Sequence, residues 1–107
     1  IPCQLEGLLR RESGESLPCS VLDLSLGGVS LAATEELFEG ESFVLSLPEH
    51  PELGELEVIM LRTQPFTGHF LGGAKFLEPS AEQQSCLADL VPRLASFSLA
   101  EEAGSDS

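Results

Sequence analysis

The chain has 107 residues, of which 42% are hydrophobic, and 18 acidic residues against five Lys and Arg give it a formal charge of −13 at pH 7. This length and composition fit one globular domain. The acidity argues against sequence-independent binding to nucleic acid or to anionic membranes, since both need a positive protein surface. A small anion can still bind where the few cations gather, because local geometry sets a short-range site.

From the N-terminus to about Phe76 the apolar residues alternate or form short runs that Gly, Pro and Ser interrupt. This pattern is typical of consecutive short strands and predicts, at first, a β meander. The first two strands are predicted over residues 4–10 and 17–22, and a hairpin turn containing Ser13-Gly14 joins them. A third strand is predicted directly after Gly27-Gly28.

Three further strands complete the β region. In residues 42–47 the period of a strand places Phe43, Leu45 and Leu47 on one face and Ser42, Val44 and Ser46 on the other. Residues 56–61 and 70–76 supply two more strands, with Thr67-Gly68 as a turn between them. Six short strands at close intervals predict a small barrel or sandwich.

The periodicity changes at Ser80, where Ser80 and Gln83 have the spacing of a capping box. The apolar residues behind this start recur at helical intervals and comprise Leu87, Leu90, Val91 and Leu94. Pro92 is expected to kink or end the helix, because it has no amide hydrogen to donate. Residues 1–98 are therefore predicted as a barrel with a C-terminal helix, and residues 99–107 as an acidic disordered tail.

The cysteines Cys3, Cys19 and Cys86 are widely spaced and odd in number, without a C-x-x-C pair. This usage predicts reduced thiols, no metal site and a cytoplasmic location. No apolar run approaches the roughly 20 residues that span a bilayer, and no signal sequence is visible, so direct membrane insertion is not expected.

One short motif indicates a candidate binding site. Asp23 ends the second apolar strand, and Ser25 and Gly28 complete the pattern D-x-S-x-x-G before the next strand. An aspartate there can accept hydrogen bonds from guanine N1–H and N2–H. Ser25 can bond a ligand or cap the turn, and Gly28 is expected to let the backbone approach the ligand closely and to support an unusual dihedral angle. The same residues also suit an ordinary turn, in which the side chains bond nearby amides, so both interpretations stay open.

With this motif the sequence resembles the PilZ family, and residues 73–76, Gly-Ala-Lys-Phe, are similar to that family's G-x-x-F strand ending. The resemblance implies a six-stranded antiparallel β-barrel of PilZ type with a C-terminal α-helix. It also implies a bacterial receptor domain that couples cyclic di-GMP to motility, biofilm or exopolysaccharide control, without catalysis and without another cofactor. The implied ligand-binding residues are Asp23, Ser25, Gly27 and Gly28. A protein partner or a fused domain is expected to receive the signal.

In the PilZ family a second motif, R-x-x-x-R, holds the phosphates and guanine faces ahead of the first strand. The 107 residues contain no such spacing, and Arg10 and Arg11 are adjacent at the far end of the first strand, as expected for surface residues beside a hairpin. Ile1-Pro2 resembles the residues after the second arginine, so the arginines are expected immediately upstream. This chain alone is then expected to bind the nucleotide weakly or undetectably, because guanidinium groups are needed for bidentate phosphate contacts.

The remaining cations, histidines and acidic residues have less specific interpretations. Arg62 and Lys75 are interpreted as solvated cations, with a place on the ligand face as the alternative. His50 and His69 have no partner at metal or triad spacing. The absence of hydrolase, P-loop and metalloprotease motifs predicts that the chain is not an enzyme. The alternative to the receptor is a PilZ-fold module that binds a protein instead of the nucleotide, and its many acidic residues between 35 and 57 suit either a basic partner or solvent.

Overall fold

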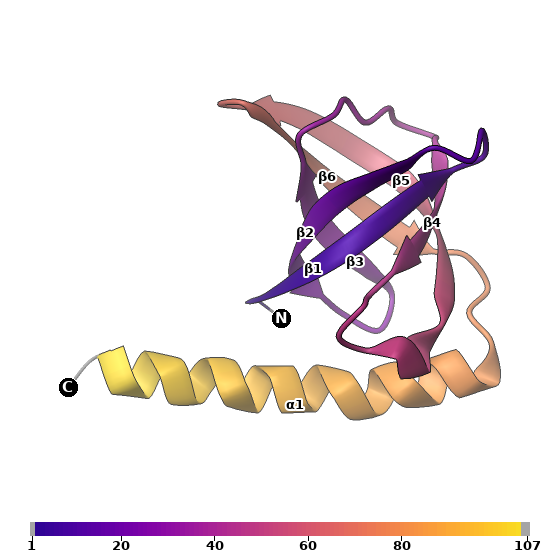
Figure 1. Ribbon diagram of the computed structural model, residues 1–107. Helices are drawn as coiled ribbons and strands as arrows, with labels where there is room; N and C mark the ends of the chain where they lie inside the picture. The colour runs from indigo at the N-terminus through magenta and orange to yellow at the C-terminus, as the bar shows by residue number, and fades with distance from the viewer. Residues whose placement is uncertain (1, 106–107) are drawn as a thin grey trace.

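The computed structural model describes the backbone of residues 2–105 and the side chains of residues 4–94. Six strands form a closed antiparallel barrel, and one long helix lies across an end of it (Figure 1). The predicted six-stranded antiparallel barrel with a C-terminal helix is thus confirmed. The elements are β1 (Pro2–Arg11), β2 (Ser16–Leu24), β3 (Gly28–Ala33), β4 (Ser42–Ser46), η1 (Pro51–Leu53, a 3-10 turn), β5 (Glu55–Phe66), β6 (His69–Phe76) and α1 (Ala81–Ser105).

The order of strands around the barrel is β1-β2-β3-β6-β5-β4. The predicted simple meander is therefore wrong after β3, because β3 pairs with β6 and β4 returns to pair with β1. Residues 34–41 carry the chain from β3 to the free edge of β1, and the β5–β6 hairpin then fills the remaining gap. Closure leaves every strand with two neighbours, which protects the backbone groups that an open sheet would expose.

The core is the apolar interior of the barrel. The inward residues of the strands are almost completely buried, and no polar or charged side chain among residues 4–94 is fully buried. Leu53 of η1 and two residues of α1, Leu87 and Leu90, are buried in the same cluster. The helix therefore covers one end of the core with the apolar face that the sequence pattern predicts.

The start of α1 is fixed by the capping box. The Ser80 amide donates to Gln83 Oε1 at 3.0 Å, and the Gln83 amide donates to Ser80 Oγ at 3.1 Å. Gln83 Nε2 also donates to the carbonyl oxygens of Leu53 (3.0 Å) and Glu55 (2.7 Å). The capping residue of the helix thus also binds the chain segment that leads into β5.

The helix does not end at Pro92 but continues to Ser105. A proline inside a helix removes one backbone hydrogen bond and lowers the stability of the helix by about 3 kcal/mol, but this loss does not end α1. The division at residue 98 into a folded body and a disordered tail stays a prediction, and residues 106 and 107 of that tail lie outside the described residues.

Arg11 is more deeply placed than the sequence indicates. It takes an inward position at the end of β1, and only 18% of its side chain is exposed. Its Nε donates to Glu41 Oε2 at 2.8 Å, its Nη2 donates to the Glu36 carbonyl at 2.5 Å, and its guanidinium lies 5.7 Å from the centre of the Phe43 ring. Arg11 therefore ties the β1–β2 hairpin to the segment before β4, whereas Arg10 lies at the surface as predicted.

Replacing Arg11 with Ala should lower the free energy of unfolding by about 1–3 kcal/mol, because the partly buried Glu41 carboxylate and the Glu36 carbonyl both lose a charged donor. The matched control is Arg10→Ala, which removes the same charge from an exposed pair with Glu55 and should cost less than about 0.5 kcal/mol. Urea unfolding of the two variants measures both values, and equal losses would contradict the structural role of Arg11.

Candidate functional site

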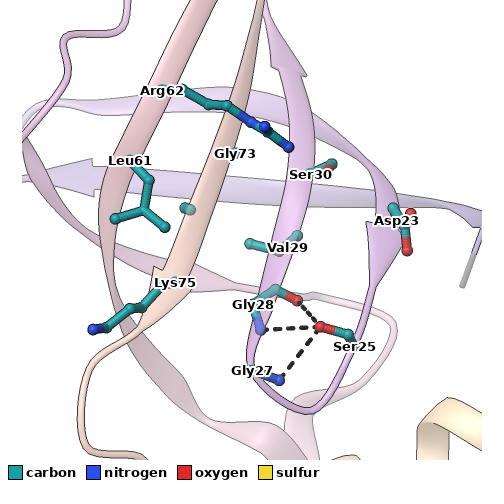
Figure 2. A pocket seen from close by; sticks show the side chains of 11 residues that line it. Asp23, Ser25, Gly27, Gly28, Val29, Ser30, Leu61, Arg62, Gly73 and Lys75 are labelled. Atoms are coloured by element: carbon teal, nitrogen blue, oxygen red, sulfur yellow. Dashed lines mark hydrogen bonds between the residues drawn. The ribbon is translucent and has the colours of Figure 1, made fainter.

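The turn from Asp23 to Gly28 is organised by the Ser25 hydroxyl. Ser25 Oγ donates to the Gly28 carbonyl at 3.2 Å and accepts from the amides of Gly27 (3.3 Å) and Gly28 (3.2 Å), as Figure 2 shows. These three bonds use the one donor and both lone pairs of a hydroxyl. In this conformation Ser25 caps the turn, which is the second of the two roles that the motif allows. Leu24 is fully buried below the turn, whereas Leu26 is 59% exposed.

Gly28 is required by a close approach of two strands. A Cβ atom at this position would lie against the Ala74 carbonyl oxygen of β6, well inside van der Waals contact. Its φ is not in the left-handed region, so the expectation of an unusual dihedral angle is wrong, and crowding against β6 is the reason for the glycine. Gly27 differs, because a Cβ there would meet no heavy atom within 4 Å.

A β-bulge in β2 turns Asp23 outward. The buried residues of β2 are odd-numbered up to Val21, and regular alternation would place Asp23 in the core. The register between β2 and β3 shifts between Val21 and Asp23, which makes Leu22 the extra residue. After the bulge Leu24 is the next buried residue, so Asp23 faces the outer surface of the barrel.

A second bulge does the same for Arg62 in β5. The buried residues of this strand are even-numbered up to Met60, so regular alternation would point Arg62 inward. The register with β6 shifts between Met60 and Arg62, and Leu61 is the extra residue, 58% exposed. Arg62 consequently faces the outer surface too.

These two outward charges lie at the ends of one row of residues across four adjacent strands. Asp23 is paired with Ser30, Ser30 with Gly73, and Gly73 with Arg62. With neighbouring strands about 4.8 Å apart, the Cα atoms at the two ends are about 14 Å apart. The Arg62 side chain lies over Gly73, where an added Cβ would be 3.1 Å from Arg62 Nε, and Figure 2 shows it pointing from β5 toward Ser30.

This row forms part of a shallow, open depression of about 660 Å³ on the outside of the barrel (Figure 2). All four residues of the predicted ligand site line it, so the structure brings them together. Strands β3, β5 and β6 add residues that the motif does not indicate. The lining residues are Asp23, Ser25, Gly27, Gly28, Val29, Ser30, Leu61, Arg62, Gly73, Ala74 and Lys75.

The depression holds a local excess of positive charge on an acidic protein. Three of the five Lys and Arg residues are paired with carboxylates, at 2.7 Å for Arg10, 2.8 Å for Arg11 and 2.9 Å for Arg93. Within the described residues the other two, Arg62 and Lys75, form no ion pair, and both line the depression. Asp23 is the only acidic residue among its described lining residues. Arg62 and Lys75 therefore lie beside the predicted ligand residues, and their place on a ligand face stays a prediction.

The other candidate residues make only local contacts in the part of the chain that the structure describes. Among the described residues no group of three or more His, Cys, Asp and Glu could hold a metal ion. His50 and His69 make local contacts, with Glu52 at 3.3 Å and with the Thr67 carbonyl at 2.9 Å. Burial raises the pKa of the Cys19 thiol to about 11, so this thiol stays protonated and unreactive near neutral pH.

Comparison with known proteins identifies the fold family. A family model described as the PilZ domain matches residues 1–93. The chain belongs to the PilZ domain family. PilZ domains are typically non-catalytic receptor domains. No curated protein matches the chain by sequence, and no helix in the described part of the chain is long and apolar enough to cross a membrane.

Several solved PilZ structures share the fold. The PilZ domain of YcgR from Escherichia coli with c-di-GMP matches with a TM-score of 0.76 and 16% identity, over 94% of this chain and 88% of that chain. Apo MrkH from K. pneumonia matches with a TM-score of 0.72 and 15% identity, over 94% and 50%. The Bacillus subtilis inhibitor of motility, MotI, matches with a TM-score of 0.70 and 20% identity, over 87% and 47%. The chain therefore spans about half the length of the MrkH and MotI chains that it matches.

Gly28→Ala should destabilise the barrel by about 1–3 kcal/mol, because the added methyl group overpacks the contact between β3 and β6. Gly27→Ala is the matched control in the same turn and should stay within about 0.5 kcal/mol of the parent protein. Thermal or urea unfolding distinguishes them, and a stable Gly28→Ala protein would show that the strands separate at little cost.

Proposed function

We propose that this PilZ domain is a bacterial receptor or regulatory domain for cyclic di-GMP. The observation that carries the proposal is the depression in which the D-x-S-x-x-G turn and the two unpaired cations face the same space. A dianionic nucleotide with guanine bases needs a base-reading acceptor and cations for its phosphates. The chain has a charge of −13, and in its described part this depression brings an acceptor for a base and two cations together.

In the proposed complex, Asp23 reads a guanine base. Its carboxylate accepts from the N1–H and N2–H donors, a pair of donors that adenine does not present. Gly27 has open space above it, so the ligand can approach the backbone of the turn. Ser25 and Gly28 act mainly by holding this turn against β6, because the hydroxyl of Ser25 is already used by the turn.

Binding is proposed to regulate rather than to make or break bonds. The ligand would change how a partner protein or a fused domain is held against the barrel, as expected for a two-state switch. The names of the structural relatives include an inhibitor of motility and a c-di-GMP-dependent transcription regulatory factor. For this chain we propose control of motility, biofilm or exopolysaccharide, with the domain acting in the cytoplasm.

One observation favours a second candidate function. No R-x-x-x-R spacing occurs in the 107 residues, and this motif is the main phosphate-binding element of PilZ receptors. The second candidate is therefore a PilZ-fold module for protein–protein interaction that does not bind the nucleotide. One measurement distinguishes the two functions. A receptor binds cyclic di-GMP in a way that depends on Asp23, and the protein-interaction module does not.

Titration calorimetry of the chain with cyclic di-GMP tests the proposal. We expect weak binding, above the micromolar range in Kd, which Asp23→Ala weakens by at least about tenfold because two charge-assisted hydrogen bonds are lost. Asp23→Asn is the matched variant, because it keeps the size of the side chain but removes its charge and one acceptor.

Cyclic di-AMP is the control ligand, since adenine lacks the donor pair that Asp23 would read. It should bind the parent protein more weakly than cyclic di-GMP and should be insensitive to Asp23→Ala. Equal affinity of the parent and the Asp23→Ala protein for cyclic di-GMP would mean that the motif is only a turn. Absence of any nucleotide binding would favour the protein-interaction module.

A further inference from the structure

We infer that Arg62 is the phosphate-binding residue of the depression, with Lys75 as a second cationic contact. The barrel strands themselves then supply positive charge for the phosphates. The inference rests on the proposed function for the identity of the nucleotide, but the anion contact itself can be tested separately. It concerns β5 and β6 and is independent of any R-x-x-x-R segment.

Three features of the strands position Arg62 for this role. The bulge at Leu61 turns its side chain to the outer surface, and the strand register places it in the row that ends at Asp23. Gly73 has no side chain, so the guanidinium can cross β6 toward β3 (Figure 2). The cation therefore lies nearer to the base-reading end of the row than its own backbone does.

The surroundings leave the guanidinium available to an anion. Arg62 is exposed and forms no ion pair within the described residues, unlike Arg10, Arg11 and Arg93. It lines the main depression and also a smaller adjoining hollow of about 320 Å³, which shares Ser30 and Gly73 with it. A planar guanidinium with five donors can then meet two oxygens of one phosphate.

Lys75 provides the second positive charge from the other side of the depression. It follows Ala74 on β6, is paired with Gly28 of the turn, and is exposed. Figure 2 shows its side chain leaving β6 on the side of Leu61, away from Arg62. The Arg62 side chain lies over Gly73 and the Lys75 side chain points away from it, so a ligand with two phosphates would meet two separate positive charges.

The contribution of each cation is tested by calorimetric titration with cyclic di-GMP. Arg62→Ala should weaken binding by about tenfold to hundredfold, as expected for loss of a charged hydrogen-bonding partner, and Lys75→Ala should have a smaller effect. Arg10→Ala is the matched control, because it removes one positive charge from β1 outside the depression and should change the affinity less than about threefold.

The position of the guanidinium is tested without removing charge. Gly73→Ala places a methyl group 3.1 Å from Arg62 Nε and 3.4 Å from its Cγ, so the flexible side chain must move. Arg62→Lys keeps the charge but loses the bidentate geometry. Both variants should keep the circular dichroism spectrum and urea midpoint of the parent close to unchanged, and both should bind more weakly than the parent.

Inorganic pyrophosphate is the base-free probe that separates this inference from the proposed function. The parent protein should bind it, as seen by NMR shifts at residues lining the depression, and Arg62→Ala should abolish those shifts. Binding of pyrophosphate but not of cyclic di-GMP would support the anion contact and overturn the proposed function. Nucleotide binding that depends on Asp23 but is equal in the Arg62→Ala and Arg10→Ala proteins would overturn the inference alone. Binding of neither probe would overturn both.

Discussion

A strand of a closed barrel points alternate side chains into an apolar core, so a charged residue at an inward position would be buried without water and at a cost of several kcal/mol. Asp23 and Arg62 both occupy positions that regular alternation assigns to the interior. The extra residues Leu22 and Leu61 reverse the alternation just before each charge. Both charged ends of the candidate site therefore depend on two bulges, which add one residue each to their strands.

The rest of the site follows from the pairing of these strands. Once β2, β3, β6 and β5 lie side by side, Asp23 and Arg62 share a row, and the small residues Ser30 and Gly73 leave space between them. Gly28 sets how closely β3 can approach β6. The same interior that excludes the charges is filled by apolar residues alone among the described side chains, so the fold and the site use opposite faces of the same strands.

Much of this could be predicted from the sequence, because strand alternation, Ser-Gly and Thr-Gly turns and the Ser80–Gln83 capping box are local signals. The pairing of β3 with β6 could not, since it joins segments about 40 residues apart and no local pattern specifies it. The motif indicated Asp23 and Gly28, but the contact that requires the glycine is with Ala74 of β6, a strand distant in sequence, and no local pattern specifies it. Arg62 was considered but its bulge was not predicted, because Met60-Leu61-Arg62 has the pattern of the end of an apolar run. A charge at an inward position was the available signal of a bulge.

Because the row faces outward, substitutions at its two ends change the surface of the barrel and leave its core unchanged. Asp23 and Arg62 stand on the surface at the two ends of the depression, and neither contributes a buried apolar side chain to the core. Either side chain can therefore be exchanged without removing an apolar side chain from the core, so the surface of the depression can change while the barrel stays folded.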